Sequence, residues 1–141
     1  AQLNDARHPR PVVRVGHPGD VGELVVCDLI FSTRGPTEGA IVVEWNVRES
    51  HQGAVAMFDA HIRIGGTTGT NLETDTCEKH KQLDALPRAS FLNLHVTPKA
   101  SGYFQNVWIW TADQYVGRLT QCVGQRCARA DQRTQRAWGV D

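Results

Sequence analysis

The sequence lacks an excess of charge of either sign. Lysine and arginine together number 15, aspartate and glutamate also number 15, and the formal net charge is zero. A protein that binds nucleic acid or an anionic membrane through its overall charge carries a clear positive excess. The balance gives no electrostatic reason to expect either partner, and we predict neither nucleic acid nor a membrane as a partner.

Long apolar runs are also missing. No stretch approaches the length that a helix needs to cross a bilayer. Residues 1–11 lack the charged and apolar regions of a signal peptide, so we expect any leader to be removed already or never present. Hydrophobic residues make up 40% and charged residues 21% of the 141 positions. This balance is typical of one globular domain with a core of its own.

Cysteine is scarce and scattered. Cys27, Cys77, Cys122 and Cys127 are too few and too far apart for a disulfide scaffold. The alternatives are a Cys122–Cys127 disulfide and free thiols. The spacing of the cysteines favours free thiols. No second cysteine pair or close histidine pair completes a zinc site. We therefore predict no metal and no cofactor.

Signals for helices are rare, whereas short β-type runs separated by Gly, Pro, Ser and Thr dominate. The best helix candidate, residues 78–86, is short and is followed by Pro87. In several runs apolar and polar residues alternate, which is the period of a strand. The chain is predicted to be all-β. We expect strands at residues 12–15, 23–31, 40–47, 57–64, 90–96 and 103–110.

Three of these runs share a further feature, an Asp or Asn directly before an apolar, any, apolar triplet. The residues are Asp28, Asp59 and Asn106. Such side chains tolerate a left-handed backbone and bond to nearby amides. A strand that bends there and continues in a new direction suits one turn of a parallel β-helix. Because the spacing of the three residues is irregular, the residues alone allow an antiparallel sandwich equally well.

Two tryptophans, Trp108 and Trp110, stand two residues apart in the last of these runs. Residues at this spacing project from the same face of a strand. The pair forms either a flat platform for a ligand such as a sugar or one layer of a core. Packing is the stronger alternative, because aromatic side chains bury large areas. The same two alternatives apply to Trp45.

Other polar residues offer weaker candidates for chemistry. Glu44 and Asp59 are carboxylates held by strands, but solvation is the default for such groups and no residue is assigned a catalytic role. His61 and His95 lie on polar faces of two strands and could meet across turns, although no third ligand completes a metal site. The segment 65–71 lacks the Lys-Ser/Thr and the helix of a phosphate loop, so we expect a turn.

Five motifs follow one another along residues 10–113: DLIFSTRGP, IVVEWN, HIRIGG, GTNL and VWIWTAD. In order and spacing they resemble the opening turns of the second β-helix domain in fungal exo-β-1,3-glucanases of glycoside hydrolase family 55. The resemblance implies a right-handed parallel β-helix of the pectin-lyase-like type. It also implies a secreted protein with β-1,3-glucan or an oligosaccharide as partner. The family hydrolyses this glucan with inversion, which needs a carboxylic acid and an activated water.

The sequence departs from that family in ways that bear on activity. The family's first β-helix has no counterpart here, and its general-acid glutamate lies downstream of the VWIWTAD segment. After Asp113 the match stops, and an arginine-rich stretch follows. We therefore expect a truncated β-helix fragment over residues 1–113. Residues 114–141 are expected to form a divergent tail, either a cap or a poorly ordered extension, with a helix over 128–137 as one option.

These observations lead to three functional expectations. The first is a β-1,3-glucan-related protein derived from an exo-β-1,3-glucanase, whose catalytic residues are unknown and which is inactive as this isolated chain. The alternative is a β-glucan-binding lectin or secreted effector without enzymatic activity. The third is a structural product that self-associates through the open ends of its β-helix. The candidate carbohydrate-binding residues are Trp45, Trp108, Trp110 and Asp113.

Overall fold

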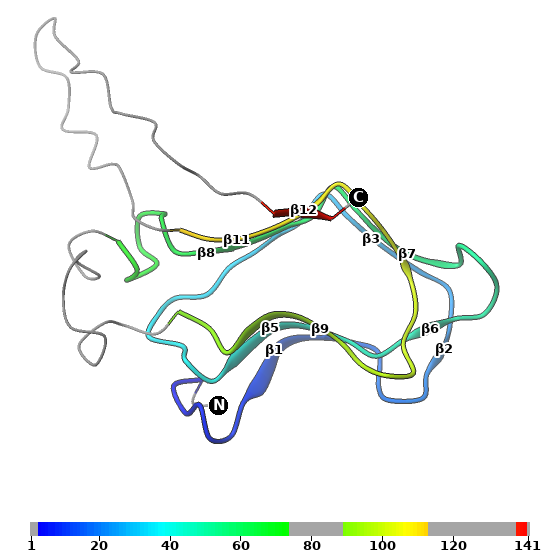
Figure 1. Ribbon diagram of the computed structural model, residues 1–141, viewed down its shortest axis with the longest axis horizontal. Coiled ribbons are helices and arrows are strands. Elements are labelled where there is room, and N and C mark those ends of the chain that lie inside the picture. The colour runs from blue at the N-terminus through cyan, green and yellow to red at the C-terminus, as the bar shows by residue number, and fades with distance from the viewer. Residues whose placement is uncertain (1–2, 74–88, 113–137, 141) are drawn as a thin grey trace, which may run out of the picture.

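The computed structural model describes residues 3–73, 89–112 and 138–140 (Figure 1). Within these ranges every regular element is a β-strand and no helix occurs, so the prediction of an all-β chain is confirmed. No helix among the described residues is long and apolar enough to span a membrane. The helices considered over 78–86 and 128–137 lie outside the described residues.

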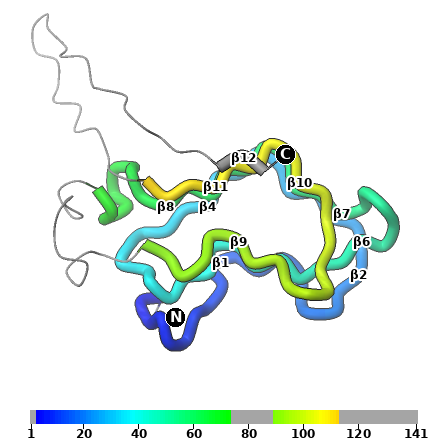
Figure 2. The backbone as a smooth tube through the Cα atoms, in the orientation of Figure 1, coloured from blue at the N-terminus to red at the C-terminus, as the bar shows by residue number. Residues whose placement is uncertain are grey.

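The strands follow three successive turns of the chain (Figure 2). The first turn contains β1 (Arg10–Val15), β2 (Val21–Gly22), β3 (Leu24–Cys27) and β4 (Ile30–Phe31). The second contains β5 (Ala40–Trp45), β6 (Arg48–Glu49), β7 (Val55–Phe58) and β8 (His61–Ile64). The third contains β9 (Leu92–Val96), β10 (Tyr103–Gln105) and β11 (Val107–Thr111). A further strand, β12, spans Trp138–Val140.

Strands at the same place in successive turns pair in parallel. The resulting sheets have the orders β1-β5-β9, β3-β7-β10 and β2-β6, and in the fourth sheet β4, β8 and β11 pair in the same way. β12 adds to the outer edge of β11 as an antiparallel strand. Figure 1 shows the equivalent strands stacked over one another. The arrangement is compatible with a parallel β-helix, and its parallel pairing excludes the antiparallel sandwich.

The three Asp/Asn residues form the bends that the sequence predicts. Asp28, Asp59 and Asn106 have φ angles of 55°, 50° and 51°, in the left-handed region. Their peptide groups also pair across turns: the Asp28 amide donates to the Phe58 carbonyl at 3.3 Å, and the Asp59 amide to the Gln105 carbonyl at 3.2 Å. Each run predicted as one strand over 23–31, 57–64 and 103–110 is therefore two strands in different sheets. Left-handed φ favours Asp and Asn over most other residues, which explains their recurrence at this corner.

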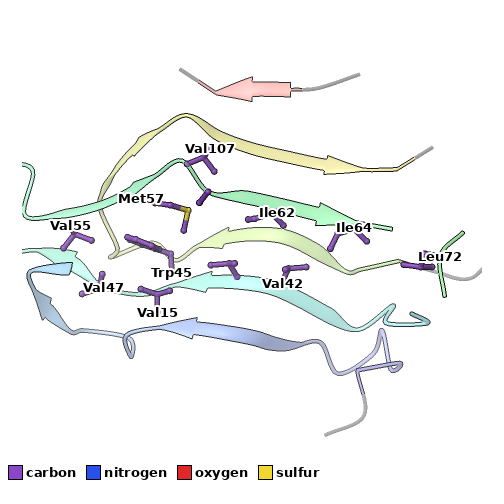
Figure 3. Packing of buried hydrophobic residues seen from close by; sticks show 12 residues of the cluster. Val15, Val42, Trp45, Val47, Val55, Met57, Ile62, Ile64, Leu72 and Val107 are labelled. Atoms are coloured by element: carbon purple, nitrogen blue, oxygen red, sulfur yellow. The ribbon is translucent and has the colours of Figure 1, made fainter. Parts of the chain in front are cut away.

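The interior is filled by apolar side chains from all the stacked turns (Figure 3). Trp45 is 0% exposed, and its ring lies against Phe104 with centroids 5.1 Å apart. The indole N–H donates to the Ser101 carbonyl at 3.1 Å, which satisfies its one polar group. A Cβ at Gly102 would lie 3.2 Å from the indole nitrogen, so a glycine allows the chain to pass close to the ring. Trp45 is thus a core residue.

Burial is deepest in the second turn, because it is covered on both sides. Met57, Ile62 and Ile64 of that turn are completely buried. In the third turn, Leu92 and Val96 remain 39% and 42% exposed. The segment 65–71, which follows β8, forms bends and turns as predicted, with positive φ at three glycines and at Asn71.

Candidate functional site

The outer face of the sheet formed by β4, β8 and β11 carries a cluster of flat side chains. Along β11, Val107 is buried, whereas Trp108 is 37% exposed and Trp110 is half-buried. The prediction that the two tryptophans share one face of a strand agrees with this alternation. Together with His61 and Arg63 of β8 they form a surface that we call the aromatic platform.

The parallel register brings the platform residues together from two turns of the chain. His61 pairs with Trp108, and Arg63 pairs with Trp110. The His61 and Trp108 rings are nearly parallel, at 8°, with centroids 6.1 Å apart. Trp110 stands edge-on to both, with centroids 5.6 Å from His61 and 6.1 Å from Trp108. Offset-parallel and edge-on contacts are the arrangements that aromatic rings prefer.

Arg63 closes one side of the platform. Its Cζ lies 5.7 Å from the centroid of the Trp110 ring, within range of a cation–π contact. Its Nη2 donates to the Gly66 carbonyl at 3.0 Å, in the turn after β8. The guanidinium group is therefore held in place both by the ring and by the backbone.

Polar groups border the platform on the side of the bend. The Trp108 indole N–H donates to Oδ1 of Asn106 at 2.6 Å. Nδ2 of Asn106 in turn donates to Oδ1 of Asp59, the residue at the equivalent bend of the preceding turn. Both Asn106 and Asp59 are exposed. An exposed ring beside an amide and a carboxylate offers an apolar face together with hydrogen-bonding groups for a small polar ligand.

A second cluster lies on the outer face of the sheet β1-β5-β9. The register stacks Arg14, Glu44 and His95 from the three turns. Nε of Arg14 donates to Oε1 of Glu44 at 2.9 Å, and Nδ2 of Asn46 donates to the same oxygen at 3.0 Å. Nδ1 of His95 lies 3.8 Å from Oε2 of Glu44. Glu44 is therefore surrounded by groups that favour its charged form.

These surroundings favour the ionised form of the Glu44 carboxyl group. The hydrogen bond from Asn46 lowers the pKa of Glu44 below its ordinary value, and partial burial opposes this effect. The hydrogen bond and charge of Arg14 lower the pKa further, as does His95. A general acid needs a raised pKa so that it keeps its proton near neutral pH. Glu44 has the opposite shift and is unsuited to that role.

The remaining polar candidates do not assemble into a site. Glu44 lies on β5, whereas Asp59 lies at the bend between β7 and β8. The expectation that His61 and His95 could meet across turns is wrong, because they belong to different sheets and pair with Trp108 and Glu44 instead. Among the described residues, no group of three His, Cys, Asp or Glu side chains could hold a metal ion.

The predicted site residues divide into three groups. Trp108 and Trp110 lie together on the surface, and Trp45 lies in the interior, a position that fits packing rather than ligand contact. Asp113 lies outside the described residues, as do Cys77, Cys122 and Cys127. Cys27 is an exposed free thiol.

Sequence reasoning missed His61 and Arg63 as neighbours of the tryptophans. The signal was available, because aligning Asp59 with Asn106 places His61 opposite Trp108 and Arg63 opposite Trp110.

No known protein-family profile matches the chain. A protein of Arthroderma benhamiae named "Probable glucan endo-1,3-beta-glucosidase" is 42% identical over 79% of this chain and 13% of its own length. A "Glucan 1,3-beta-glucosidase" of Cochliobolus carbonum is 39% identical over 79% of this chain and 14% of its own length. The Penicillium expansum protein "Non-secreted LysM effector LysM15" is 46% identical over 80% of this chain and 8% of its own length. The chain thus spans a small part of the curated relatives it matches.

Proposed function

We propose that this chain, which is homologous to a segment of glucan 1,3-β-glucosidases from fungi, binds β-1,3-glucan or its oligosaccharides on the aromatic platform. The observation that carries the proposal is the exposed Trp108 beside Trp110 on one outer face of the fold. The C–H bonds of a pyranose ring present an apolar face, and an indole ring provides a flat surface of matching size.

The groups around the platform support a sugar as the ligand. Asn106 and Asp59 lie at its border and keep acceptor capacity for hydroxyl groups. The guanidinium group of Arg63 already contacts the Trp110 ring and the Gly66 carbonyl. It therefore needs no anionic group from the ligand, and an uncharged sugar suits the platform. We also propose that Asp113, which directly follows the described residues 89–112, belongs to the same binding site.

The handedness and the type of the β-helix are part of the proposal as well. We infer a right-handed, pectin-lyase-like β-helix, supported by three turns in parallel register and by the likeness to the glucosidases.

An extracellular location is also proposed, because the polysaccharide is met outside the cell. One relative is named non-secreted, so a secretion assay decides this point. In a longer protein, the platform would hold the glucan while another part carries out hydrolysis.

A pull-down on insoluble β-1,3-glucan tests the binding proposal. We expect the chain to be retained, and the substitutions Trp108→Ala and Trp110→Ala each to weaken retention. Tyr103→Ala is the matched control, because Tyr103 is also an exposed aromatic residue but lies on β10 in another sheet. Retention that is unchanged by both tryptophan substitutions would remove the basis of the proposal.

Hydrolysis by the purified 141-residue chain is not expected. The lowered pKa of Glu44 disfavours an acid role, and Glu44 and Asp59 lie in separate parts of the fold. Incubation with laminarin followed by glucose detection tests this expectation. Robust release of glucose would show that the chain carries a catalytic pair of its own.

A role in binding without catalysis is the second candidate function. It is favoured by the relative that is named a LysM effector and is 46% identical to this chain. Binding without glucose release by the purified chain fits both candidates. A laminarin assay on a longer protein that contains this segment separates them, because only the first candidate predicts release of glucose there.

A further inference from the structure

We infer that Asn106 is a positioning residue for the platform and that Asp59 fixes the orientation of Asn106. Asn106 holds the Trp108 ring in the geometry that stacks on a sugar. The inference rests on the proposed function, in which Trp108 is the ring that contacts the ligand. Its basis is a relay of two hydrogen bonds that links two turns of the fold to the exposed ring.

The chemistry of the three groups leaves one arrangement of the Asn106 amide. An indole N–H can only donate, so it requires Oδ1 of Asn106 as its partner at 2.6 Å. An ionised carboxylate can only accept, so Asp59 requires Nδ2 of Asn106. The two neighbours therefore select the same amide orientation. A flipped amide would place two donors together at the indole and two acceptors together at the carboxylate, so both hydrogen bonds would be lost.

The bends of the backbone bring the three residues together. Asp59 and Asn106 occupy equivalent left-handed positions in adjacent turns. Backbone hydrogen bonds flank the pair on both sides, from the Asp59 amide to the Gln105 carbonyl at 3.2 Å and from the Trp108 amide to the Ala60 carbonyl at 3.0 Å. The side chains of Asp59 and Asn106 are thus stacked on a rigid corner, which gives the relay a fixed base.

Such a relay matters because Trp108 is exposed. An exposed indole that rotates freely about χ1 and χ2 loses this freedom when a ligand stacks on it. The lost conformational entropy weakens binding. His61 restrains one side of the ring by its nearly parallel contact. The hydrogen bond to Asn106 restrains the ring within its own plane. A ring that is held in place before binding loses less freedom when the sugar arrives.

Substitution by glycine tests the relay without straining the bend, because glycine accepts positive φ. In Asn106→Gly we expect binding of laminarihexaose, measured by calorimetry, to weaken about three- to tenfold, the factor that one net hydrogen bond represents. Asp59→Gly is expected to weaken binding in the same direction. Asp59→Asn keeps an acceptor for Nδ2, so it is expected to lose less affinity than Asp59→Gly.

A readout without ligand accompanies the binding measurement. The indole N–H signal of Trp108, assigned by its loss in Trp108→Phe, is followed by hydrogen exchange. We expect faster exchange in Asn106→Gly and in Asp59→Gly, and a smaller change in Asp59→Asn. Asp28→Gly is the matched control, since it makes the same change at the equivalent bend of the first turn and is expected to alter neither readout.

The two readouts separate this inference from the proposed function. Slow exchange of the Trp108 N–H that persists in Asn106→Gly would overturn the relay, whatever the binding result. Equal affinity of Asn106→Gly and the unaltered chain for laminarihexaose would overturn its role in binding. If the unaltered chain does not bind laminarihexaose, the proposed function fails, and the exchange experiment still decides whether Asn106 holds the ring.

Discussion

At the scale of single residues, the surroundings of Glu44 determine its charge. Its carboxylate accepts hydrogen bonds from Asn46 and Arg14, and its side chain is only 13% exposed. The sequence shows Glu44 on a strand, yet it does not show that Arg14 and His95 stack on it from neighbouring turns. That placement depends on the register, which is set by segments far apart in the chain.

The lowered pKa of Glu44 predicts how stability changes with pH. Because the pKa in the folded state lies below the ordinary value of 4.5, the unfolded chain takes up a proton first as the pH falls. The stabilisation is therefore complete above about pH 4.5 and is lost as the pH falls through the lower, folded-state pKa.

In Glu44→Gln we expect a loss of about 1 kcal/mol of unfolding free energy at pH 7, since a hydrogen bond to a charged group is replaced by a neutral one. Urea denaturation at pH 7 and at pH 3 measures it, and the difference from the unaltered chain should shrink at the lower pH. Glu23→Gln, at a carboxylate whose side chain is 73% exposed, is the control. An equal difference at both pH values would contradict the assignment.

Trp45 and the pair Trp108 and Trp110 show what can be predicted for individual aromatic residues. The period of two places Trp108 and Trp110 on one face of β11, and this is local information. Sequence leaves packing and ligand contact open for all three residues. Burial resolves the alternatives for Trp45, because only its position in the second turn, between Val15 of β1 and Val96 of β9, encloses it.

At the scale of the elements, the Asp and Asn bends organise the fold. Because Asp28, Asp59 and Asn106 recur at one corner, the sequence could predict where the strands change direction. It could not predict which strands pair, since the segments between the turns differ in length and hide the repeat. The platform neighbours His61 and Arg63 were missed for this reason, although the bend residues supply the alignment that brings them opposite Trp108 and Trp110.

The left-handed bend at Asp28 provides a test of this element. Asp28 is exposed and has a φ of 55°, so a substitution there changes the backbone preference without opening a cavity. Asp28→Gly is expected to be nearly neutral, whereas Asp28→Val should cost about 1–3 kcal/mol because a β-branched residue is strained at positive φ. Urea denaturation with an unchanged m-value measures both. Equal stability of the two variants would contradict the role of the bend.

At the scale of the whole molecule, the fold is a stack whose middle turn is buried and whose outer turns are partly exposed. No described strand pairs with the outer edge of β9 or β10. Leu92, Val96 and Tyr103 on these strands are exposed. Free strand edges with apolar side chains are surfaces on which further strands can add.

We therefore predict that the chain self-associates through the third turn. Sedimentation velocity over a hundredfold range of concentration should show the mean mass rising, and Val96→Lys should lower it, because a charge on an edge strand disfavours pairing. A mass that stays monomeric over the whole range would contradict the prediction.

The indole N–H signals of the tryptophans report directly on whether the aromatic platform binds β-1,3-glucan. On addition of laminarihexaose to the chain labelled with ¹⁵N, we predict that the signals of Trp108 and Trp110 shift in a saturable way. The buried Trp45, whose N–H is bonded to the Ser101 carbonyl, should not respond. Signals of Trp108 and Trp110 that stay unmoved at saturating sugar would contradict binding on the platform.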